Sequence, residues 1–291
     1  MADTVASGLS VGALYVLLAL GFTVTLGIGE MVNLAHGGTV VAGMYTVYAL
    51  STSLSVPVYL AVVAAVGVCT LLSLVIYLVA IEPSRRSGGG IAASHREQVI
   101  YTLVITSALA IAFQLFFGGD LKGLPFAQSE PVRILGISLT SSRLIALVVA
   151  AVVTVALVLW LRCSTIGRLV LMTGKYTESA YAIGVPVPWV FLAVFCLGGA
   201  LAGLAGGLLM TILPVSPTIG LQFLIIALIV SIAGRLSFAG VGLVGLAYGV
   251  GQAVLSSKLS GSATAMLIFA AFLGVLSLER IFIGRAARRQ A

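Results

Sequence analysis

The chain has 291 residues, of which 60% are hydrophobic and only 8% are charged, and its formal net charge is +7. A soluble domain carries about 25% charged residues, so this composition excludes an ordinary water-soluble protein. The positive charge does not indicate nucleic-acid binding, because the basic residues stand between apolar segments. We therefore expect an all-α integral membrane protein, a polytopic helical bundle surrounded by lipid.

Apolar runs close to the length that crosses a bilayer, about 20 residues, recur along the whole chain. They predict about eight or nine transmembrane helices in one domain, residues 1–291. Several runs are short, so we expect at least one to be half of a broken helix. The N-terminus has no basic residue before the first run, which favours a retained helix over a signal peptide. The expected runs are Val5–Leu26, Ala35–Leu50, Pro57–Ala80, Val99–Gly118, Leu139–Leu161, Pro188–Ile212, Ile219–Ala233, Gly240–Ser256 and Ala263–Leu278.

The lysine and arginine residues predict the orientation of the chain, because basic loops face the cytoplasm. Tracing the nine runs backward from a cytoplasmic C-terminus places 11 of the 15 basic residues inside and 4 outside. The same parity places the N-terminus outside. The four outside residues are Lys122, Arg133, Arg143 and Lys258.

Cysteine and glycine spacing bears on cofactors and packing. Cys69, Cys163 and Cys196 lie in or beside apolar runs without a Cys-x-x-Cys pair, so we expect no disulfide, metal site or cofactor. Glycines four residues apart share one helix face and let two helices approach closely in lipid. This pattern favours packing within the chain over a dimer interface. The packing glycines are Gly199, Gly203, Gly207, Gly245 and Gly249.

Polar residues within the membrane are concentrated in one glycine-flanked segment, Gly27–Gly38, which contains Glu30, Asn33 and His36. Ionisable groups inside a bilayer are costly and often functional. If the segment is a helix broken at membrane depth, its free backbone groups line a cavity or are buried in protein. The alternative is a short cytoplasmic turn in which Glu30 and His36 contact water.

The inside segment Arg162–Val187 is too long for a turn and too polar to cross the membrane. Ser164 or Thr165 is a candidate cap for a first short helix. Residues 177–183 predict a second helix, which Gly184 and Pro186 end. Two short cytoplasmic helices are suited to docking a cytosolic protein, and the alternative is an amphipathic helix that lies on the membrane surface.

Five segments, taken in order, resemble the branched-chain amino acid permease family of ABC importers. Residues 33–37 read Asn-Leu-Ala-His-Gly, similar to that family's Asn-Phe-Ala-His-Gly signature. Residues 164–168, followed by Ala180 and residues 183–185, resemble its cytoplasmic coupling loop. The opening residues 8–23, residues 200–207 and the turn at 217–220 also fit.

This resemblance implies a non-catalytic pore half in the bacterial cytoplasmic membrane. Two cytosolic ATPases, a second permease (identical or a paralogue) and an extracytoplasmic solute-binding protein would complete the importer. The implied coupling loop is residues 162–187, and Glu30, Asn33 and His36 would lie near the translocation path. The implied ATPase contacts are Gly167, Arg168, Glu178, Ala180 and Gly184.

Other classes of membrane protein fit the sequence less well. An ion-coupled secondary transporter generally uses an intramembrane acid, and Glu30 is the only candidate, at the edge of a run. A channel would need a filter motif, and none stands out. Without a Walker A loop the chain cannot hydrolyse ATP itself. The solute stays open between branched-chain amino acids and related small polar solutes, because relatives are associated with urea, short amides and aromatic acids.

Overall fold

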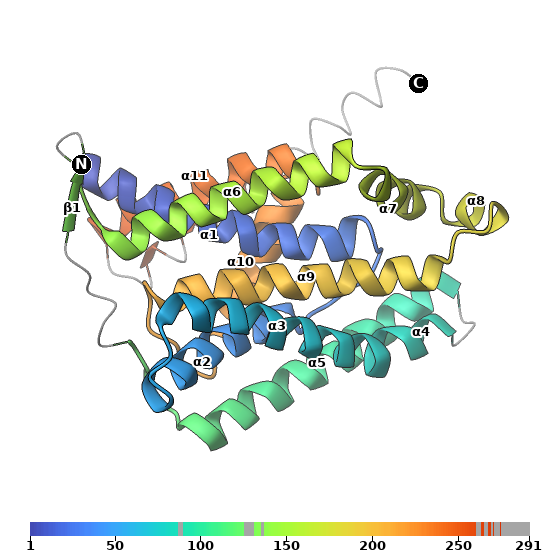
Figure 1. Cartoon of the computed structure of the whole chain (residues 1–291), viewed down its shortest axis with the longest axis horizontal. Helices are drawn as coiled ribbons and strands as arrows, with labels where there is room; N and C mark the ends of the chain where they lie inside the picture. Colours follow the sequence, from blue (N-terminus) through green and yellow to red (C-terminus); the bar gives the residue numbers. More distant parts are fainter. Residues whose placement is uncertain are drawn as a thin grey trace.

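The structure is a computed structural model that describes residues 1–86, 90–124, 131–134 and 137–259, with residues 263, 264, 267, 268, 270 and 274. Long helices run side by side along the longest axis of the molecule (Figure 1). The helical segments are α1 (Ala2–Gly27), α2 (His36–Ser53), α3 (Val58–Ile76), the π-helical turn η1 (Tyr77–Ile81), α4 (Glu82–Arg86), α5 (Gly90–Phe117), α6 (Ser141–Cys163), α7 (Thr165–Lys175), α8 (Thr177–Ala182), α9 (Val187–Met210), α10 (Gly220–Ala233) and α11 (Phe238–Ser256).

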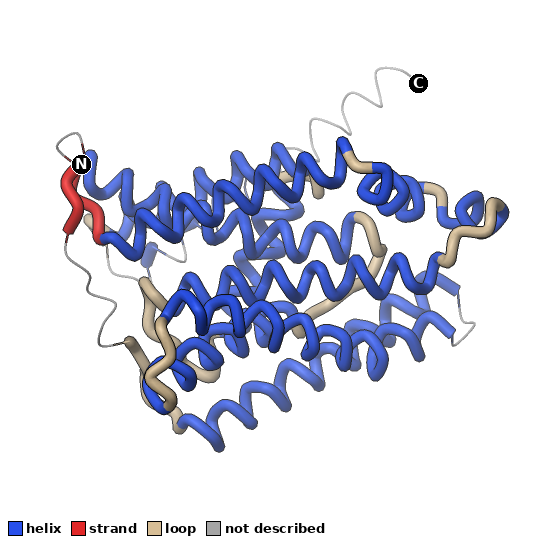
Figure 2. The backbone as a smooth tube through the Cα atoms, in the orientation of Figure 1, coloured by secondary structure: helices blue, strands red, loops and turns tan. Residues whose placement is uncertain are grey.

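The only strands among the described residues are β1 (Pro131–Ile134) and β2 (Ile137–Thr140), which pair antiparallel with Pro131 opposite Thr140. Figure 2 shows this hairpin beside the N-terminus, at the end of the bundle opposite α7 and α8. The hairpin falls in the segment expected outside the membrane, and α7 and α8 fall in the segment expected inside. We therefore call these the outer and inner ends.

Six helical segments in the described part of the chain are long and apolar enough to cross a membrane. The expectation of an all-α polytopic membrane protein is confirmed. The fourth run begins earlier than expected, because the helix starts at Gly90 rather than Val99. The ninth run, Ala263–Leu278, lies largely outside the described residues. The six segments are Ala2–Gly27, Val58–Arg86, Ala92–Phe117, Ser141–Cys163, Val187–Met210 and Phe238–Ser256.

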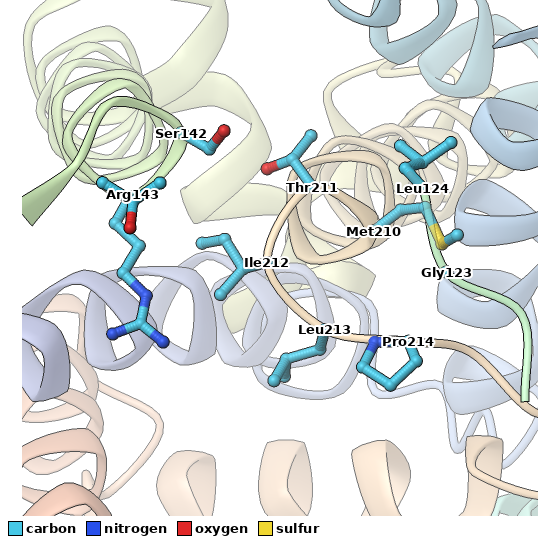
Figure 3. A pocket seen from close by; sticks show the side chains of 10 residues that line it. Gly123, Leu124, Ser142, Arg143, Met210, Thr211, Ile212, Leu213 and Pro214 are labelled. Carbon is cyan, nitrogen blue, oxygen red and sulfur yellow. The ribbon is translucent and has the colours of Figure 1, made fainter. Parts of the chain in front are cut away.

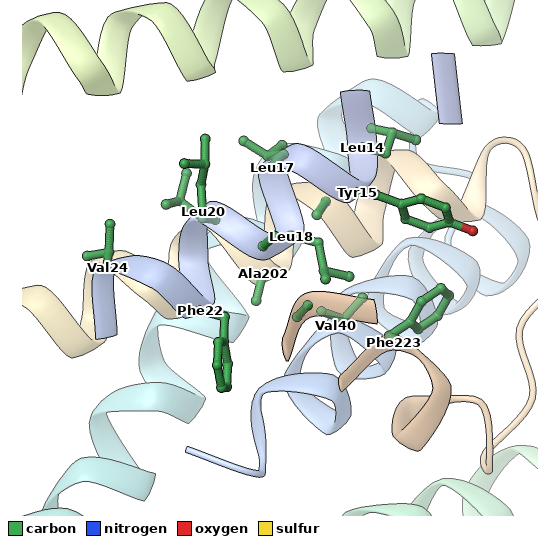
Figure 4. Close-up of a cluster of buried hydrophobic side chains, with 14 of the residues drawn as sticks. Leu14, Tyr15, Leu17, Leu18, Leu20, Phe22, Val24, Val40, Ala202 and Phe223 are labelled. Atoms are coloured by element: carbon green, nitrogen blue, oxygen red, sulfur yellow. The ribbon is translucent and has the colours of Figure 1, made fainter. Parts of the chain in front are cut away.

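Helix α1 is the centre of the fold. In its most apolar window 83% of the residues are buried inside the chain, and α6, α9, α10 and α11 all pack against it. A helix that is apolar all round is stable only when neighbours or lipid cover every face. Figure 4 shows Leu17 and Leu20 of α1 pointing to one side of the helix and Phe22 to the opposite side, with Val40 and Phe223 of neighbouring helices nearby.

The packing glycines lie where helices of this same chain meet. On α9, a side chain added at Gly199, Gly203 or Gly207 would meet α3, at Ser73, Ala65 or Val62 respectively. On α11, Gly245 faces Val16 of α1 and Gly249 faces Gly12. Backbones that approach this closely gain dispersion contact along the whole crossing, which drives helix association in lipid.

Two helices are short and begin inside the bundle, so the expected broken helices are present. The His36 ring, at the start of α2, is hydrogen-bonded to Leu18 O, nine residues before the end of α1. At 1.5 Å per residue this places the start of α2 about 14 Å inside the inner end of α1. Gly37 in turn contacts the Gly220 carbonyl at the start of α10. The second run is therefore a broken helix, and its N-terminus meets that of α10.

Candidate functional site

The two short helices expected at the inner end are present, and they project beyond α6 and α9 (Figure 1). The Ser164 side chain accepts a hydrogen bond from Gly167 N at 2.8 Å and so caps α7. Gly167, Val170 and Thr173 are buried against the bundle at a spacing of three. The neighbouring apolar stripe is exposed, with Ile166 64%, Leu169 40% and Met172 60% accessible. Helix α7 therefore presents apolar side chains outward while a second face holds it to the bundle.

Helix α8 continues this exposed surface. Ala180 is buried and fixes the helix in place, whereas Tyr181 and Ile183 are 55% and 78% exposed. Gly184 adopts φ +81°, a left-handed conformation that ends the helix and that a residue with a side chain adopts only under strain.

Charged side chains flank the apolar stripe. Arg168 on α7 and Glu178 on α8 are both exposed. Exposed apolar side chains rimmed by charge are typical of a protein-binding surface. Helices α7 and α8, residues 165–182, together form what we call the inner hairpin. The exposed Arg168 and Glu178 therefore lie on the same inner hairpin as the buried Gly167 and Ala180.

The connection between α1 and α2, residues 28–35, runs from the inner end back into the bundle. Asn33 is 3% exposed, and its side-chain oxygen accepts from Ala35 N at 3.0 Å, which tightens the turn into α2. His36 is 1% exposed, its Nε2 donates a hydrogen bond to Leu18 O at 3.0 Å, and its ring lies edge-on to the Phe22 ring. Both side chains shape the start of α2 and present almost no surface to a solute.

Glu30 lies at a different level from Asn33 and His36. It is exposed at the inner end and has φ +51°, a left-handed conformation that is uncommon outside glycine. Its carbonyl oxygen is hydrogen-bonded to the His95 ring nitrogen at 2.9 Å. The three polar residues of this segment therefore do not form one cluster.

A row of polar side chains on α5, which the sequence pattern alone did not reveal, holds the connection between α1 and α2. Above His95, Gln98 accepts from Val32 N at 2.9 Å, and Thr102 accepts from Leu34 N at 3.1 Å. Thr106 then donates to Leu34 O at 3.0 Å. Backbone groups at membrane depth require such partners, because lipid offers none. We name His95, Gln98, Thr102 and Thr106 the α5 ladder.

The sequence contains a signal for the α5 ladder, because its four polar residues are spaced three or four apart in a mostly apolar segment. The expected start at Val99 left His95 in a loop, so the common face was not apparent. Since the helix begins at Gly90, all four residues lie on one face.

The inner hairpin contacts the same connection. A side chain added at Gly174 of α7 would meet Ile28 O, so the two backbones touch. Arg85 donates to Gly29 O at 3.3 Å, and its guanidinium lies 4.1 Å from the centre of the Phe191 ring of α9. Residues 28–35 therefore join α7, α4, α9 and the α5 ladder.

The outer end contains two neighbouring cavities. One, of about 340 Å³, lies between the start of α6 and the connection that follows α9. Figure 3 shows Ser142, Thr211 and Pro214 around it, with Arg143 reaching across α1. The second cavity, of about 390 Å³, shares Arg143 and Leu213 with the first.

The described residues offer no three His, Cys, Asp or Glu side chains grouped as a metal site. Cys69 is buried, Cys163 is exposed and Cys196 is partly buried, and all three are free thiols. The polar groups described above hold helices together or face water at the two ends of the bundle.

The helices long enough to cross a membrane, two broken helices and a projecting pair of short helices define a multi-pass helical membrane protein. The sequence model of the family described as the branched-chain amino acid transport system permease component matches residues 4–276. The chain therefore belongs to this family of ABC importer permeases and is a multi-pass protein of the inner membrane.

Two named relatives are similar to the chain over most of its length. The high-affinity branched-chain amino acid transport system permease protein LivH of Escherichia coli K12 is 26% identical over 285 residues, covering 93% of this chain and 91% of that protein. The corresponding protein BraD of Pseudomonas aeruginosa is 28% identical, covering 85% and 83%.

A solved structure with a similar fold is PsaBC from Streptococcus pneumoniae in complex with Fab. Its TM-score is 0.50 at 14% identity, and the likeness covers 92% of this chain and 89% of that chain. At this identity the likeness concerns the fold alone.

Proposed function

We propose that this chain is one of two permease halves of an importer that carries a branched-chain amino acid, or a related small polar solute, into the cell. The names of LivH and BraD support the solute class. The observation that carries the proposal is the inner hairpin of α7 and α8, which exposes apolar side chains beyond the membrane-crossing helices. Such a surface supports docking to a cytosolic partner, because exposed apolar area is costly in water.

The proposed partners follow from this arrangement. Two cytosolic ATPases drive the cycle, an identical or paralogous second permease completes the pore, and an extracytoplasmic protein delivers the solute. The chain itself is non-catalytic and lies in the bacterial cytoplasmic membrane with its C-terminus inside. Residues 162–187 form the coupling loop within a single permease domain.

The ATPase surface combines exposed and buried residues with different roles. The stripe of Ile166, Leu169 and Met172 enters a groove of the ATPase, and Arg168 and Glu178 set the register through charge. Gly167 and Ala180 act indirectly, because they are buried and hold the two helices to the bundle. Gly184 allows the chain to turn back into α9.

Movement of the hairpin reaches the membrane through residues 28–35. Gly174 touches Ile28, and the same connection is hydrogen-bonded to α5 along the ladder. A displacement of α7 therefore moves α5 and the start of α2 together, and these elements bound the inner half of the translocation path. Glu30 faces water at its inner mouth, while Asn33 and His36 set where α2 begins.

Affinity purification from gently solubilised native membranes tests the assembly. We expect an ATPase, a second permease and a solute-binding protein to copurify. Purification of the chain alone, with uptake driven by an ion gradient in liposomes, would contradict the proposal and favour a secondary transporter or channel.

Charge reversal at the hairpin tests the docking surface. Arg168→Glu should reduce recovery of the ATPase at least about tenfold while the permease stays folded, because charge-assisted contacts are worth about 1.5–3 kcal/mol. The control Lys122→Glu makes the same charge change at the outer end. Equal recovery of ATPase with both variants would exclude Arg168 from the interface.

The role of the α2 start is tested by His36→Ala. Uptake should fall while the complex still assembles, because the bond to Leu18 O no longer fixes the start of the helix. Unchanged uptake would mean that His36 does not affect the path.

A further inference from the structure

The cavity of about 390 Å³ at the outer end is lined by side chains with opposite charge. It lies among the first turns of α1, the start of α6, the end of α11 and Leu213. Its volume falls within the range of about 300–1,000 Å³ that is usual for small-molecule sites. Asp3 and Arg143 both line it, and Gln252 and Tyr15 lie along its wall.

Arg143 supplies a cationic group that the fold leaves unused. Its guanidinium has no ion pair or hydrogen bond with another residue in the described part of the chain. Figure 3 shows the side chain extended away from Ser142 and over α1. A partly buried guanidinium in this position favours an anionic ligand, because it binds a carboxylate through two parallel hydrogen bonds.

The same cavity has acceptors that match an ammonium group. The side-chain oxygen of Gln252 is shielded from solvent and has no hydrogen-bond partner among the described residues. A buried acceptor without a donor costs about 1–3 kcal/mol, so a donor from a ligand would remove that cost. Asp3 adds a negative charge, and its Oδ1 accepts a hydrogen bond from Ser138 N at 3.0 Å.

The wall between these polar groups contains apolar surface. Val11 and Leu213 line the cavity together with the ring of Tyr15, which is 2% exposed. The cavity therefore combines a cation, an anion, a buried acceptor and an apolar wall. This combination complements a zwitterion that carries an apolar side chain.

We propose that this outer cavity is a receiving site for a free zwitterionic α-amino acid, in which Arg143 binds the carboxylate and Asp3 and Gln252 bind the ammonium. The inference rests on the proposed import function, because that function makes the outer end the face where the solute arrives. The site gives a role to the Arg143 guanidinium and to the side-chain oxygen of Gln252, which have no partner among the described residues.

The test measures binding of radiolabelled leucine to the complete complex in nanodiscs, without the solute-binding protein. We expect saturable binding that unlabelled leucine displaces. Isopentylamine, which lacks the carboxylate, and 4-methylpentanoate, which lacks the ammonium, should displace it at least about tenfold less well. Absence of saturable binding to the wild-type complex would overturn the proposal.

Variants locate the site. Arg143→Gln should weaken leucine binding at least about tenfold, and Arg143→Lys should weaken it less. Asp3→Asn should weaken binding of leucine and isopentylamine, which carry an ammonium group, but not binding of 4-methylpentanoate, which lacks one. The control Lys258→Gln removes a positive charge from an exposed outer position that does not line the cavity. Unchanged binding in Arg143→Gln would overturn the assignment.

A lipid headgroup carries related charges, so nanodiscs of phosphatidylethanolamine are compared with nanodiscs of phosphatidylglycerol. Leucine binding that persists in phosphatidylglycerol supports the free amino acid. The proposal would be overturned if the wild-type complex retained phosphatidylethanolamine, the Arg143→Gln variant lost it, and neither bound leucine.

Uptake measured on the same preparations, with the binding protein added, separates the two proposals. Normal uptake by Arg143→Gln at an unchanged KM would reject the site and leave the import function standing. A wild-type complex that transports no branched-chain amino acid, yet binds another zwitterion through Arg143, would reject the solute and support the site.

Discussion

Helices α1 and α5 are both apolar enough to cross a membrane, yet the rest of the chain buries α1 and leaves α5 largely uncovered. In the most apolar window of α1, 83% of the residues are buried inside the chain, against 6% in that of α5. Helix α1 is held by close backbone contact with α11 and α9, whereas α5 is held along its inner half by the polar ladder. A buried core helix and a peripheral helix are therefore attached by different forces.

The difference has a physical cause. Close packing is weakened along a whole crossing when helices separate by a fraction of an ångström, so the neighbours of α1 strongly constrain it. A few hydrogen bonds and the aromatic contacts of Phe113 and Phe117 with Tyr45 attach α5 to the bundle, and most of its surface is not covered by the chain. The predictions below test this contrast, starting with the largest expected effect.

Gly249→Val should destabilise the α1–α11 contact by about 3 kcal/mol, because the new side chain meets the backbone of Gly12. Thermal unfolding of the detergent-solubilised chain measures the change. Gly251→Val on the same helix is the control, since nothing lies within 4 Å of a side chain added there. Equal loss in both variants would mean that valine disturbs α11 itself rather than the crossing.

Gln98→Leu should cost about 1–3 kcal/mol, because Val32 N then has no acceptor at membrane depth. We also expect ATP hydrolysis by the complex to continue while uptake falls, since α5 no longer follows residues 28–35. Gln114→Leu, at an exposed position of the same helix, is the matched control. Coupled uptake in the Gln98 variant would show that the ladder is not needed for transmission.

Tyr45→Phe should change stability by less than about 1 kcal/mol, in the stabilising direction. The Tyr45 hydroxyl is buried without a partner among the described residues, so its removal relieves a cost. The ring would keep its stack on Phe117 of α5, whose centroid lies 4.4 Å away. Unfolding of Tyr45→Phe beside Tyr45→Ala separates the hydroxyl from the ring, and a marked loss in Tyr45→Phe would reveal a partner for the hydroxyl.

Arg86→Gln should have the smallest effect, no more than about 0.5 kcal/mol. Arg86 pairs with Glu82 at 2.8 Å, but its side chain is 79% exposed, and exposed ion pairs contribute little. Arg85→Gln should cost more, because Arg85 contacts Gly29 O and the Phe191 ring. A larger loss of stability in Arg86→Gln than in Arg85→Gln would argue against a role for residues 28–35 in linking α4 and α9.

The sequence predicted the elements better than their connections. The capped helix after Ser164 and the helix end at Gly184 follow from local preferences, so both were placed correctly. The ladder on α5 was missed because a start at Val99 concealed one polar face. Its meaning also depends on residues 28–35, which are more than 60 positions away in sequence.

Composition alone determined that the chain lies in a membrane as a helical bundle, because too few charged residues exist to face water. Spacing determined which glycines lie together on one helix face, because the helical repeat fixes it. Only the tertiary structure decided what those faces touch, where α2 begins and that Arg143 shares a cavity with Asp3. These depend on contacts between segments distant in the chain, which no local pattern of residues encodes.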